Sequence, residues 1–181
     1  MLIDQNNSAL LVIDVQTKLL GPVHESAALV RNCEWLIKLA QLLEVPVLAT
    51  EQYPQGLGPT APELRELLTE QQIYPKTVFS CLEADNCQQA FEQLDREQYI
   101  LCGMEAHVCV LQTALGLQAE GKHVFVVADA ISSRSPQDRD LAMERMAAAG
   151  ISIVTKEMVG FEWVRRSDMP QFKTFSKEFL R

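Results

Sequence analysis

The sequence predicts an α/β protein, a three-layer sandwich in which a parallel sheet carries helices on both faces. Short β-rich runs alternate along the chain with longer stretches whose apolar residues recur at helical spacing. These runs are apolar at nearly every position, as is typical of parallel strands buried on both sides. We count six short strands and find no repeat, low-complexity tract or charge block. We therefore expect residues 1–181 to form a single domain.

The elements follow one another in a regular order. The strands with clear boundaries are predicted at 9–14, 45–50, 97–103, 123–129 and 151–155. A further β-rich segment follows Lys76 in the run IYPKTVFSC. The clearest helices are predicted at 26–43 and 135–150, and the second has Ser135 as its N-cap and Pro136 at its first position.

The longest stretch without clear periodicity is 51–61, EQYPQGLGPTA. Thr60 and Glu63 have the spacing of a capping box and predict a short helix after this loop. A long loop just past the carboxyl end of a strand is where α/β proteins build ligand sites. Its first ten residues contain no Asp or His, and the three histidines of the chain are scattered, so we expect no metal site. The glycines of PQGLGP lack the context of a dinucleotide site, and we expect no cofactor.

The composition argues against several classes of partner. The net charge of −8 disfavours a nucleic-acid partner, because such proteins usually carry a basic patch. No apolar run approaches the roughly 20 residues that span a bilayer, and the N-terminus lacks the features of a signal peptide. Five cysteines without CxxC spacing favour reduced thiols over a disulfide framework. We therefore expect a cytoplasmic protein without a membrane partner.

Three residues could carry chemistry. Asp14 ends the first strand, at the sheet edge where α/β proteins bind ligands. Cys109 lies near the start of the helix that follows strand 97–103, where the helix dipole would lower its pKa and free N–H groups could stabilise an oxyanion. Lys76 could complete an activated nucleophile by placing a cation beside the thiol and the carboxylate.

Each of these three residues also has a structural explanation. Asp14 could cap the local turn, Cys109 could be a buried inert thiol, and Lys76 could be a solvated surface residue. If Cys109 is the nucleophile, iodoacetamide should label it fastest of the five cysteines. Replacing Asp14 by Asn or Lys76 by Ala should then slow the labelling.

The motifs LLVIDVQ, YPKTVFS and GMEAHVCVLQTA, in this order and spacing, resemble the isochorismatase-like cysteine hydrolase superfamily. TEQYPQGLGPTAPEL and DAISSRSPQDRDLAMERM resemble its isochorismatase domain-containing protein subgroup, over nearly the whole chain. The resemblance implies a sheet of order 3-2-1-4-5-6, which makes strands 1 and 4 neighbours. It maps the catalytic triad onto Asp14, Lys76 and Cys109. It also implies a cis peptide between Met104 and Glu105, with the N–H groups of Glu105 and Cys109 as the oxyanion hole.

The resemblance and the residues together predict a cysteine-dependent hydrolase of a small amide, ureide or related acyl substrate, acting through a thioester. Nicotinamidases of this family hold a metal through residues that loop 51–60 lacks. Two alternatives stay open: an isochorismatase-type ether hydrolase with Cys109 as a bystander, and a non-catalytic interaction protein on the same fold. The candidates to line the substrate pocket are Leu19, Tyr53, Phe79 and His107.

The C-terminal segment carries a large share of the aromatic residues beyond the last strand. Its apolar residues are Phe161, Trp163, Phe172, Phe175, Phe179 and Leu180. Large exposed apolar patches are rare on monomers and usually mark interfaces. Members of the family that the chain resembles often form dimers or larger rings, so we expect a homo-oligomer. The alternative is that a terminal helix docks on its own domain.

Overall fold

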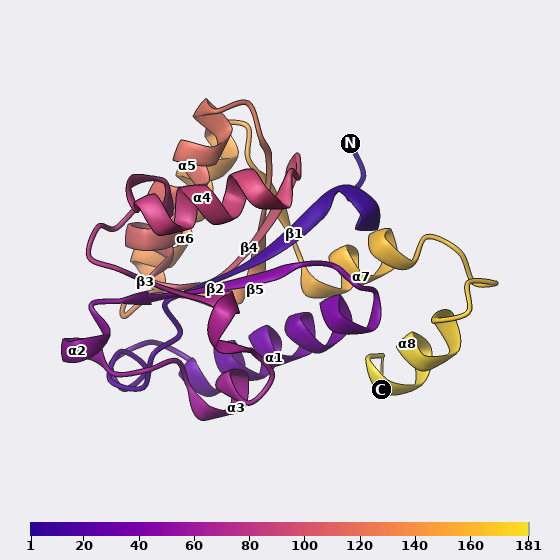
Figure 1. Cartoon of the computed structure of the whole chain (residues 1–181), viewed down its shortest axis with the longest axis horizontal. Helices are drawn as coiled ribbons and strands as arrows, with labels where there is room; N and C mark the ends of the chain where they lie inside the picture. The colour runs from indigo at the N-terminus through magenta and orange to yellow at the C-terminus, as the bar shows by residue number, and fades with distance from the viewer. Residues whose placement is uncertain (181) are drawn as a thin grey trace.

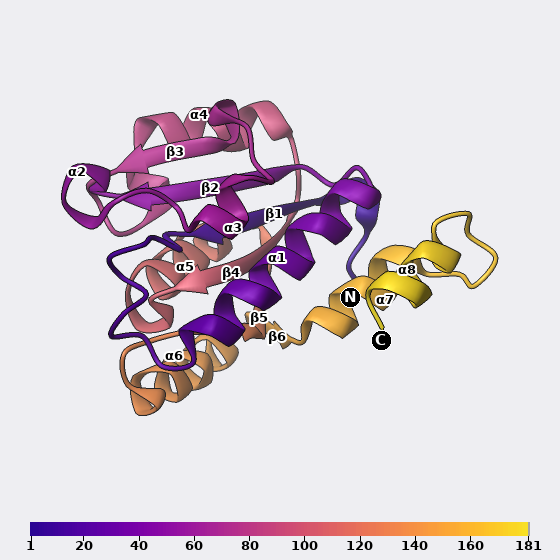
Figure 2. The same ribbon diagram turned by 90° about the horizontal axis from the view of Figure 1, so that it is seen from below.

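The computed structural model describes residues 1–180 and is built on one six-stranded sheet. The strands are β1 (Ser8–Ile13), β2 (Val47–Gln52), β3 (Ile73–Lys76), β4 (Gln98–Met104), β5 (His123–Ser132) and β6 (Ser152–Val154). Their order is β3-β2-β1-β4-β5-β6, and every neighbouring pair is parallel. Figures 1 and 2 show the sheet edge-on and from below. The predicted fold class and strand order are confirmed.

Helices cover both faces of the sheet, which makes three layers. The longer helices are α1 (Ser26–Leu42), α4 (Asp85–Leu94), α5 (Leu111–Ala119), α6 (Pro136–Ala148), α7 (Lys156–Val164) and α8 (Phe172–Glu178). The short ones are η1 (Gln5–Asn7), α2 (Pro54–Leu57), α3 (Pro62–Arg65), η2 (Glu70–Gln72), η3 (Cys81–Glu83) and the π-helical turn η4 (Ala106–Val110). In Figure 1, α4, α5 and α6 lie above the sheet, and α1, α3, α7 and α8 lie below it.

The core divides between the two faces of the sheet because side chains of a strand alternate in direction. In β1, Leu10 and Val12 belong to the cluster under α1 and α7. Ala9, Leu11 and Ile13 belong to the cluster under α4, α5 and α6. Both sets are buried, as the uninterrupted apolar pattern of this strand predicts.

Two local predictions are wrong. The strand near Lys76 ends at this residue and does not follow it, because its partner β2 ends at Gln52 and offers nothing further to pair with. Thr60 does not cap a helix: its N–H and hydroxyl both donate to Glu51 Oε1, at 2.7 and 2.8 Å. Helix α3 begins instead at Pro62.

The C-terminal aromatic residues dock on their own chain. Trp35 of α1 makes edge-on contacts with Phe175 and Phe179, at ring-centroid distances of 6.4 and 5.3 Å. Phe175 is fully buried, and its ring also packs against Phe161 of α7 at 5.2 Å. The alternative named from the sequence, that a terminal helix docks on its own domain, thus describes this segment. Only part of the set stays accessible, with Phe161 about half exposed.

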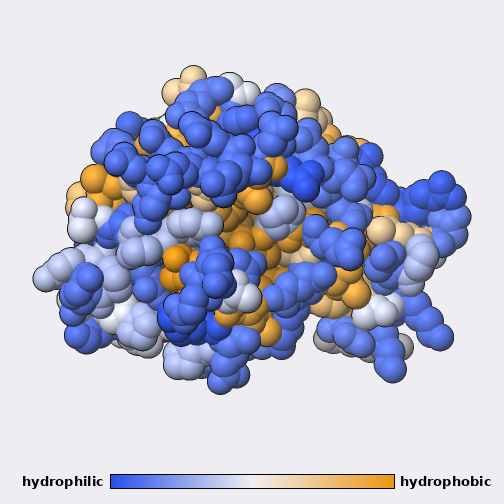
Figure 3. Space-filling model, viewed as in Figure 1, coloured by the Kyte–Doolittle hydropathy of each residue, from blue (hydrophilic) through white to orange (hydrophobic). Residues whose placement is uncertain are grey.

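The surface is largely hydrophilic over the helix layer that contains α4. Figure 3 shows hydrophobic side chains reaching the surface in a band between the two helix layers, along the edge of the sheet. Within residues 1–180, none of the helices has both the length and the apolarity needed to cross a bilayer.

Candidate active site

The carboxyl ends of four neighbouring strands meet at one edge of the sheet. Strand pairing places Gln52 of β2 opposite Lys76 of β3, and Ile13 of β1 opposite Gly103 of β4. Asp14 directly follows Ile13, so it lies between the end of β2 and the end of β4. The strand order 3-2-1-4 thus gathers the sequence-predicted residues at one place, as the switch point of an α/β sheet does.

Gly103 allows β4 to approach β1 closely beside this edge. Its φ is +114°, and a Cβ atom at this position would lie 2.1 Å from the carbonyl oxygen of Ile13. No larger residue fits without moving a strand, since real Cβ atoms do not come this near to a backbone oxygen. The glycine therefore fixes the position of the turn 104–110, which carries Cys109, relative to Asp14.

Asp14 and Lys76 form a buried ion pair. Lys76 Nζ lies 2.8 Å from Asp14 Oδ2, and both side chains are excluded from solvent. The second carboxylate oxygen, Oδ1, accepts a hydrogen bond from Thr50 Oγ1 at 2.7 Å. Asp14 has φ of 51°, a left-handed conformation that Asp tolerates better than most residues. The structure therefore excludes the simple alternative that Lys76 is a solvated surface residue.

Lys76 stays charged because its surroundings supply oxygen atoms and negative charge. Burial alone would lower the pKa of the Lys76 ammonium, but the charge of Asp14 and the hydrogen bond to it raise the pKa above its ordinary value. Nζ also donates to Gln52 Oε1 at 2.7 Å and contacts the carbonyl oxygens of residues 78 and 79, at 3.3 and 3.2 Å. The ammonium is a fixed cation at the floor of the site.

Gln52 is a member of this network that sequence reasoning missed. Its side chain accepts from Lys76 Nζ and donates to the carbonyl oxygen of Thr77 at 2.9 Å. Its backbone N–H donates to Gln16 Oε1 at 2.7 Å, and Gln16 Nε2 returns a bond to the Gln52 carbonyl at 3.0 Å. The signal available in the sequence is a polar pair, EQ, at the end of an apolar strand. That signal gives no direction for the side chain.

Cys109 is the fourth residue of η4, and its thiol is protonated at neutral pH. Burial and the negative charge of Asp14 raise the pKa of the Cys109 thiol well above its ordinary value, and Lys76 offsets only part of this. The expectation that the helix start lowers this pKa is wrong, because Cys109 is only 6% exposed. A buried thiol beside a carboxylate keeps its proton, and the carboxylate is placed to accept that proton.

Cys81 brings a second thiol to the same cation. It is buried at the start of η3, and its N–H donates to Thr113 Oγ1 at 3.0 Å. A hydrogen bond from Cys87 and the charge of Lys76 lower the pKa of the Cys81 thiol. Cys81 was not predicted to have a role, because its spacing to the other motifs forms no recognisable pattern.

The turn before Cys109 contains two further predicted residues. The Met104–Glu105 peptide bond is cis, as the resemblance implied. Glu105 precedes η4 as its N-cap residue, with its carboxylate 3.0 Å from Arg134 Nε. His107 is half-buried, and its Nδ1 lies 2.9 Å from Ser133 Oγ.

The remaining pocket candidates divide into two groups. Tyr53 and Phe79 both have exposed side chains, and their backbones contact Lys76: Tyr53 N–H donates to the Lys76 carbonyl at 2.8 Å, and the Phe79 carbonyl accepts from Nζ. Leu19 instead packs against the core cluster that contains α1. The backbones of Tyr53 and Phe79 therefore adjoin the candidate site through Lys76.

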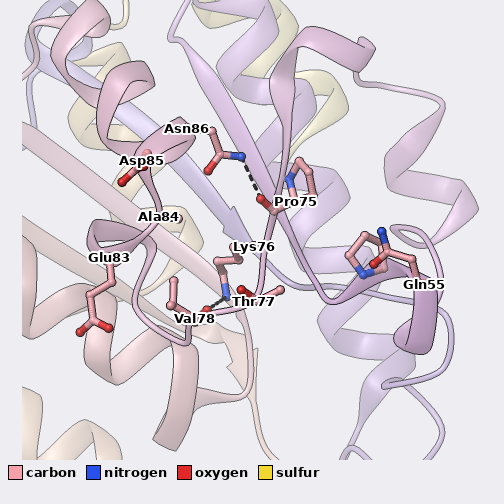
Figure 4. Close-up of a pocket in the computed structure, with 10 residues that line it drawn as sticks. Gln55, Pro75, Lys76, Thr77, Val78, Glu83, Ala84, Asp85 and Asn86 are labelled. Atoms are coloured by element: carbon pink, nitrogen blue, oxygen red, sulfur yellow. Dashed lines mark hydrogen bonds between the residues drawn. The ribbon is translucent and has the colours of Figure 1, made fainter.

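A cavity of about 440 Å³ is lined by residues 75–78 and 83–86, Lys76 among them, and by Pro54 and Gln55. Figure 4 shows its walls, with the Lys76 ammonium bonded to the Val78 carbonyl and Asn86 Nδ2 bonded to the Pro75 carbonyl. Asp14 and Cys109 do not line this cavity. It adjoins the ion pair without reaching the thiol.

Glu51, near the end of β2, binds the segment that follows this strand. Glu51 Oε1 accepts from Thr60 and from Arg65 Nη1, at 3.1 Å for the latter. Within residues 1–180, no group of three or more His, Cys, Asp or Glu side chains is arranged to hold a metal ion. Glu51 thus holds the loop 53–61 in place through Thr60.

Residues 8–158 match the isochorismatase domain family. The chain belongs to this family. Isochorismatase domain-containing protein 2A of Mus musculus is 41% identical over 174 residues, which cover 94% of this chain and 82% of that relative. The resemblance stated from the sequence is thereby confirmed.

Two solved structures extend the comparison within the isochorismatase fold. The MAR1 ribonuclease from Caenorhabditis elegans superposes with a TM-score of 0.93 at 40% identity, covering 100% of this chain and 93% of that one. The YcaC gene product of Escherichia coli, described as an octameric hydrolase of unknown specificity, superposes with a TM-score of 0.92 at 28% identity, covering 99% and 92%. Hydrolases thus occur among the relatives of this isochorismatase domain.

Proposed function

We propose that this isochorismatase-family protein is a cysteine hydrolase of a small amide, ureide or related acyl substrate, acting on a non-peptide C–N bond without a cofactor. The observation that carries the proposal is the juxtaposition of the Cys109 thiol with the buried Asp14–Lys76 ion pair. A nucleophile, a proton acceptor and a fixed cation are the groups that acyl transfer requires.

In this mechanism Asp14 accepts the thiol proton as Cys109 attacks the substrate carbonyl carbon. The thiol is neutral before the substrate arrives, so its proton must pass to Asp14 within the catalytic cycle. The N–H groups of Glu105 and Cys109 donate to the oxyanion that forms. Asp14 then returns the proton to the amine as the C–N bond breaks. Water attacks the thioester and gives a proton to Asp14, the C–S bond breaks, and the Cys109 sulfur regains a proton as the acid product leaves. Lys76 keeps the carboxylate of Asp14 in place and balances its charge throughout.

The experiment is a screen of small amides and ureides against the wild type, Cys109→Ala and Cys33→Ala. Cys33 is a buried thiol on α1 and serves as the matched control. We expect hydrolysis by the wild type and Cys33→Ala, and its loss in Cys109→Ala. Hydrolysis of a vinyl ether that survives in Cys109→Ala would instead support the isochorismatase-type alternative. Activity that persists after dialysis against a chelator would support the absence of a metal.

A ribonuclease activity is the second candidate, because the C. elegans structure carries that name at 40% identity. The net charge of −8 opposes binding to a phosphate backbone. RNA therefore belongs in the same screen, at low salt, with Cys109→Ala beside the wild type. We expect no cleavage of RNA. If the protein is instead a non-catalytic interaction protein, it should hydrolyse none of the compounds in the screen.

A further inference from the structure

The segment that follows β5 touches the turn that carries Cys109 at two points. Strand pairing places Met104 of β4 opposite Ser132 of β5, so the chain leaves both strands at the same edge of the sheet. The next two residues of the segment, Ser133 and Arg134, then bond to side chains of the turn. We propose that Ser133 and Arg134 are positioning residues that hold the nucleophile turn in its productive geometry. This inference rests on the proposed hydrolase function.

Arg134 holds Glu105 by two donors on one oxygen. The backbone N–H and the Nε–H of Arg134 both donate to Glu105 Oε2, each at 3.0 Å. The Glu105 side chain is only 13% exposed, whereas that of Arg134 is 61% exposed. The carboxylate is thus drawn into the protein and fixed there, and the arginine covers it from the solvent side. A charge-assisted bond of this kind is stronger than a neutral one.

Ser133 holds the next polar residue of the turn and connects it to a third loop. It is fully buried, and its Oγ lies 2.9 Å from His107 Nδ1. Its carbonyl accepts from the His24 N–H at 3.0 Å, and Ser132 Oγ donates to the His24 carbonyl at 2.6 Å. His24 belongs to the loop that follows Asp14. The segment 132–134 therefore ties the loop of the base to the turn of the nucleophile.

The consequence of these contacts is geometric more than energetic. An ion pair whose arginine is largely exposed contributes little to stability, so we expect Arg134 to add little to the folded state. The backbone N–H of Glu105 is one of the proposed oxyanion donors, and Cys109 follows four residues later. A displacement of about 1 Å at a reacting group can cost up to 100-fold in rate. Anchoring Glu105 and His107 limits such displacement at the start of η4.

The test compares Arg134→Ala with Arg166→Ala. Arg166 forms a similar exposed pair with Asp168, at 2.6 Å, and serves as the matched control. On the best substrate of the screen, we expect kcat of Arg134→Ala to fall about tenfold, with KM changed less than twofold. Complete loss of one oxyanion donor lowers kcat by about 10²–10³, and a displaced donor should lose only part of this. Arg134→Lys should recover part of the loss, and Arg166→Ala should match the wild type.

A second measurement is independent of any substrate. Hydrogen exchange of the peptide that spans 104–110 should be faster in Arg134→Ala and in Ser133→Ala than in the wild type, and unchanged in Arg166→Ala. In the double variant Glu105→Ala, Arg134→Ala this peptide should exchange no faster than in Glu105→Ala alone, because the two substitutions remove the same interaction. Unchanged exchange in Arg134→Ala would overturn the inference even if no substrate is found. Faster exchange with no hydrolysis by the wild type would support the anchoring and count only against the proposed function.

Discussion

Lys76 Nζ lies 2.8 Å from Asp14 Oδ2 in a part of the molecule that solvent does not reach. Removing two charges from water costs several kcal/mol per ion, and their attraction repays this only where further hydrogen bonds complete both groups. Thr50 completes the carboxylate, and Gln52 with two loop carbonyls completes the ammonium. An apolar pair would stabilise the fold at least as well. A contribution to stability therefore does not explain the ion pair, whereas a role beside the Cys109 thiol does.

The first prediction concerns the reactivity of Cys109. Because the charge of Asp14 raises the pKa of this thiol, Asp14→Asn should accelerate its alkylation by iodoacetamide at pH 7, about tenfold for each unit that the pKa falls. Lys76→Ala should slow it, because Lys76 acts in the opposite direction. The measurement is the labelling rate of each cysteine by mass spectrometry. The rate of hydrolysis should instead fall in Asp14→Asn, by at least about 100-fold, because the proton acceptor is lost.

Asp168→Asn is the control, because this exposed carboxylate lies in a surface pair with Arg166. Among the five cysteines, Cys109 is 6% exposed and the others are 0–1% exposed, so it should label first but more slowly than a free thiol. Slower labelling of Cys109 in Asp14→Asn would contradict the electrostatics described above. It would restore the expectation, drawn from the sequence, that the acid activates the thiol of the free protein.

The sequence predicted the fold well because its signals are local and repeated. The strand 9–14 is an uninterrupted apolar run and the helix 26–43 shows helical periodicity. The structure places β1 at Ser8–Ile13 and α1 at Ser26–Leu42. The capping box predicted from Thr60 failed for a different reason. A carboxylate nine residues earlier, Glu51, accepts both donors of Thr60 once the loop has folded back.

The site was predictable only in part, because its electrostatics depend on burial. Asp14, Lys76 and Cys109 were identified from their motifs, and the structure brings them together. The direction in which the pKa of Cys109 shifts was not predictable, because burial of the thiol in the packed turn sets it. Gln52 and Arg134 were missed because their partners lie far away in the sequence, and no local pattern marks such contacts.

The second prediction is that stability falls on the alkaline side, and that Cys109 contributes to the slope. The folded protein keeps the Cys109 proton above pH 8.5, where the unfolded chain loses it. Unfolding then releases a proton, and the free energy of unfolding falls by up to about 1.4 kcal/mol per pH unit. Below pH 8.5 both states hold the proton and this contribution is fully present. Cys109→Ser should therefore show a shallower slope than the wild type between pH 8.5 and 10.

Urea unfolding in a reducing buffer measures this slope. Cys87 and Cys102 also have raised pKa values, but they are present in both proteins and cancel in the comparison. The slopes between pH 6 and 7.5 should agree, which controls for a general effect of the substitution. Equal slopes above pH 8.5 would show that Cys109 does not carry a raised pKa in the folded protein.

The third prediction compares two glycines with positive φ. Gly103→Ala would place a Cβ 2.1 Å from the Ile13 carbonyl oxygen, whereas a Cβ on Gly121 meets nothing within 4 Å. The backbone conformation alone costs about 1–2 kcal/mol in each variant. The overlap at Gly103 adds about 1–3 kcal/mol, because a strand must shift. Gly103→Ala should also reduce hydrolysis, since the shift moves the nucleophile turn away from Asp14. Equal destabilisation by the two variants, measured in urea, would show that the close approach of β4 to β1 is not required.

The last prediction concerns assembly. Docking of α8 on α1 covers most of the C-terminal aromatic residues, yet Met158 of α7 remains 45% exposed beside the half-exposed Phe161. The E. coli relative is described as an octamer. Light scattering in dilute neutral buffer should therefore give a multiple of the 20.3 kDa chain mass. Met158→Asp should lower that mass, because a charge at an apolar contact opposes association.

The control for assembly is Leu141→Asp on α6, in the opposite helix layer. Leu141 is 54% exposed, so the substitution is matched in exposure and in charge, and we expect the mass to stay that of the wild type. Met158 is preferred to Phe161 for the test, because Phe161 also packs against Phe175 and its loss would loosen α8. A wild-type mass near 20.3 kDa would mean that the aromatic segment only completes the core of its own chain. An oligomer that Met158→Asp leaves intact would place the interface on a surface other than α7.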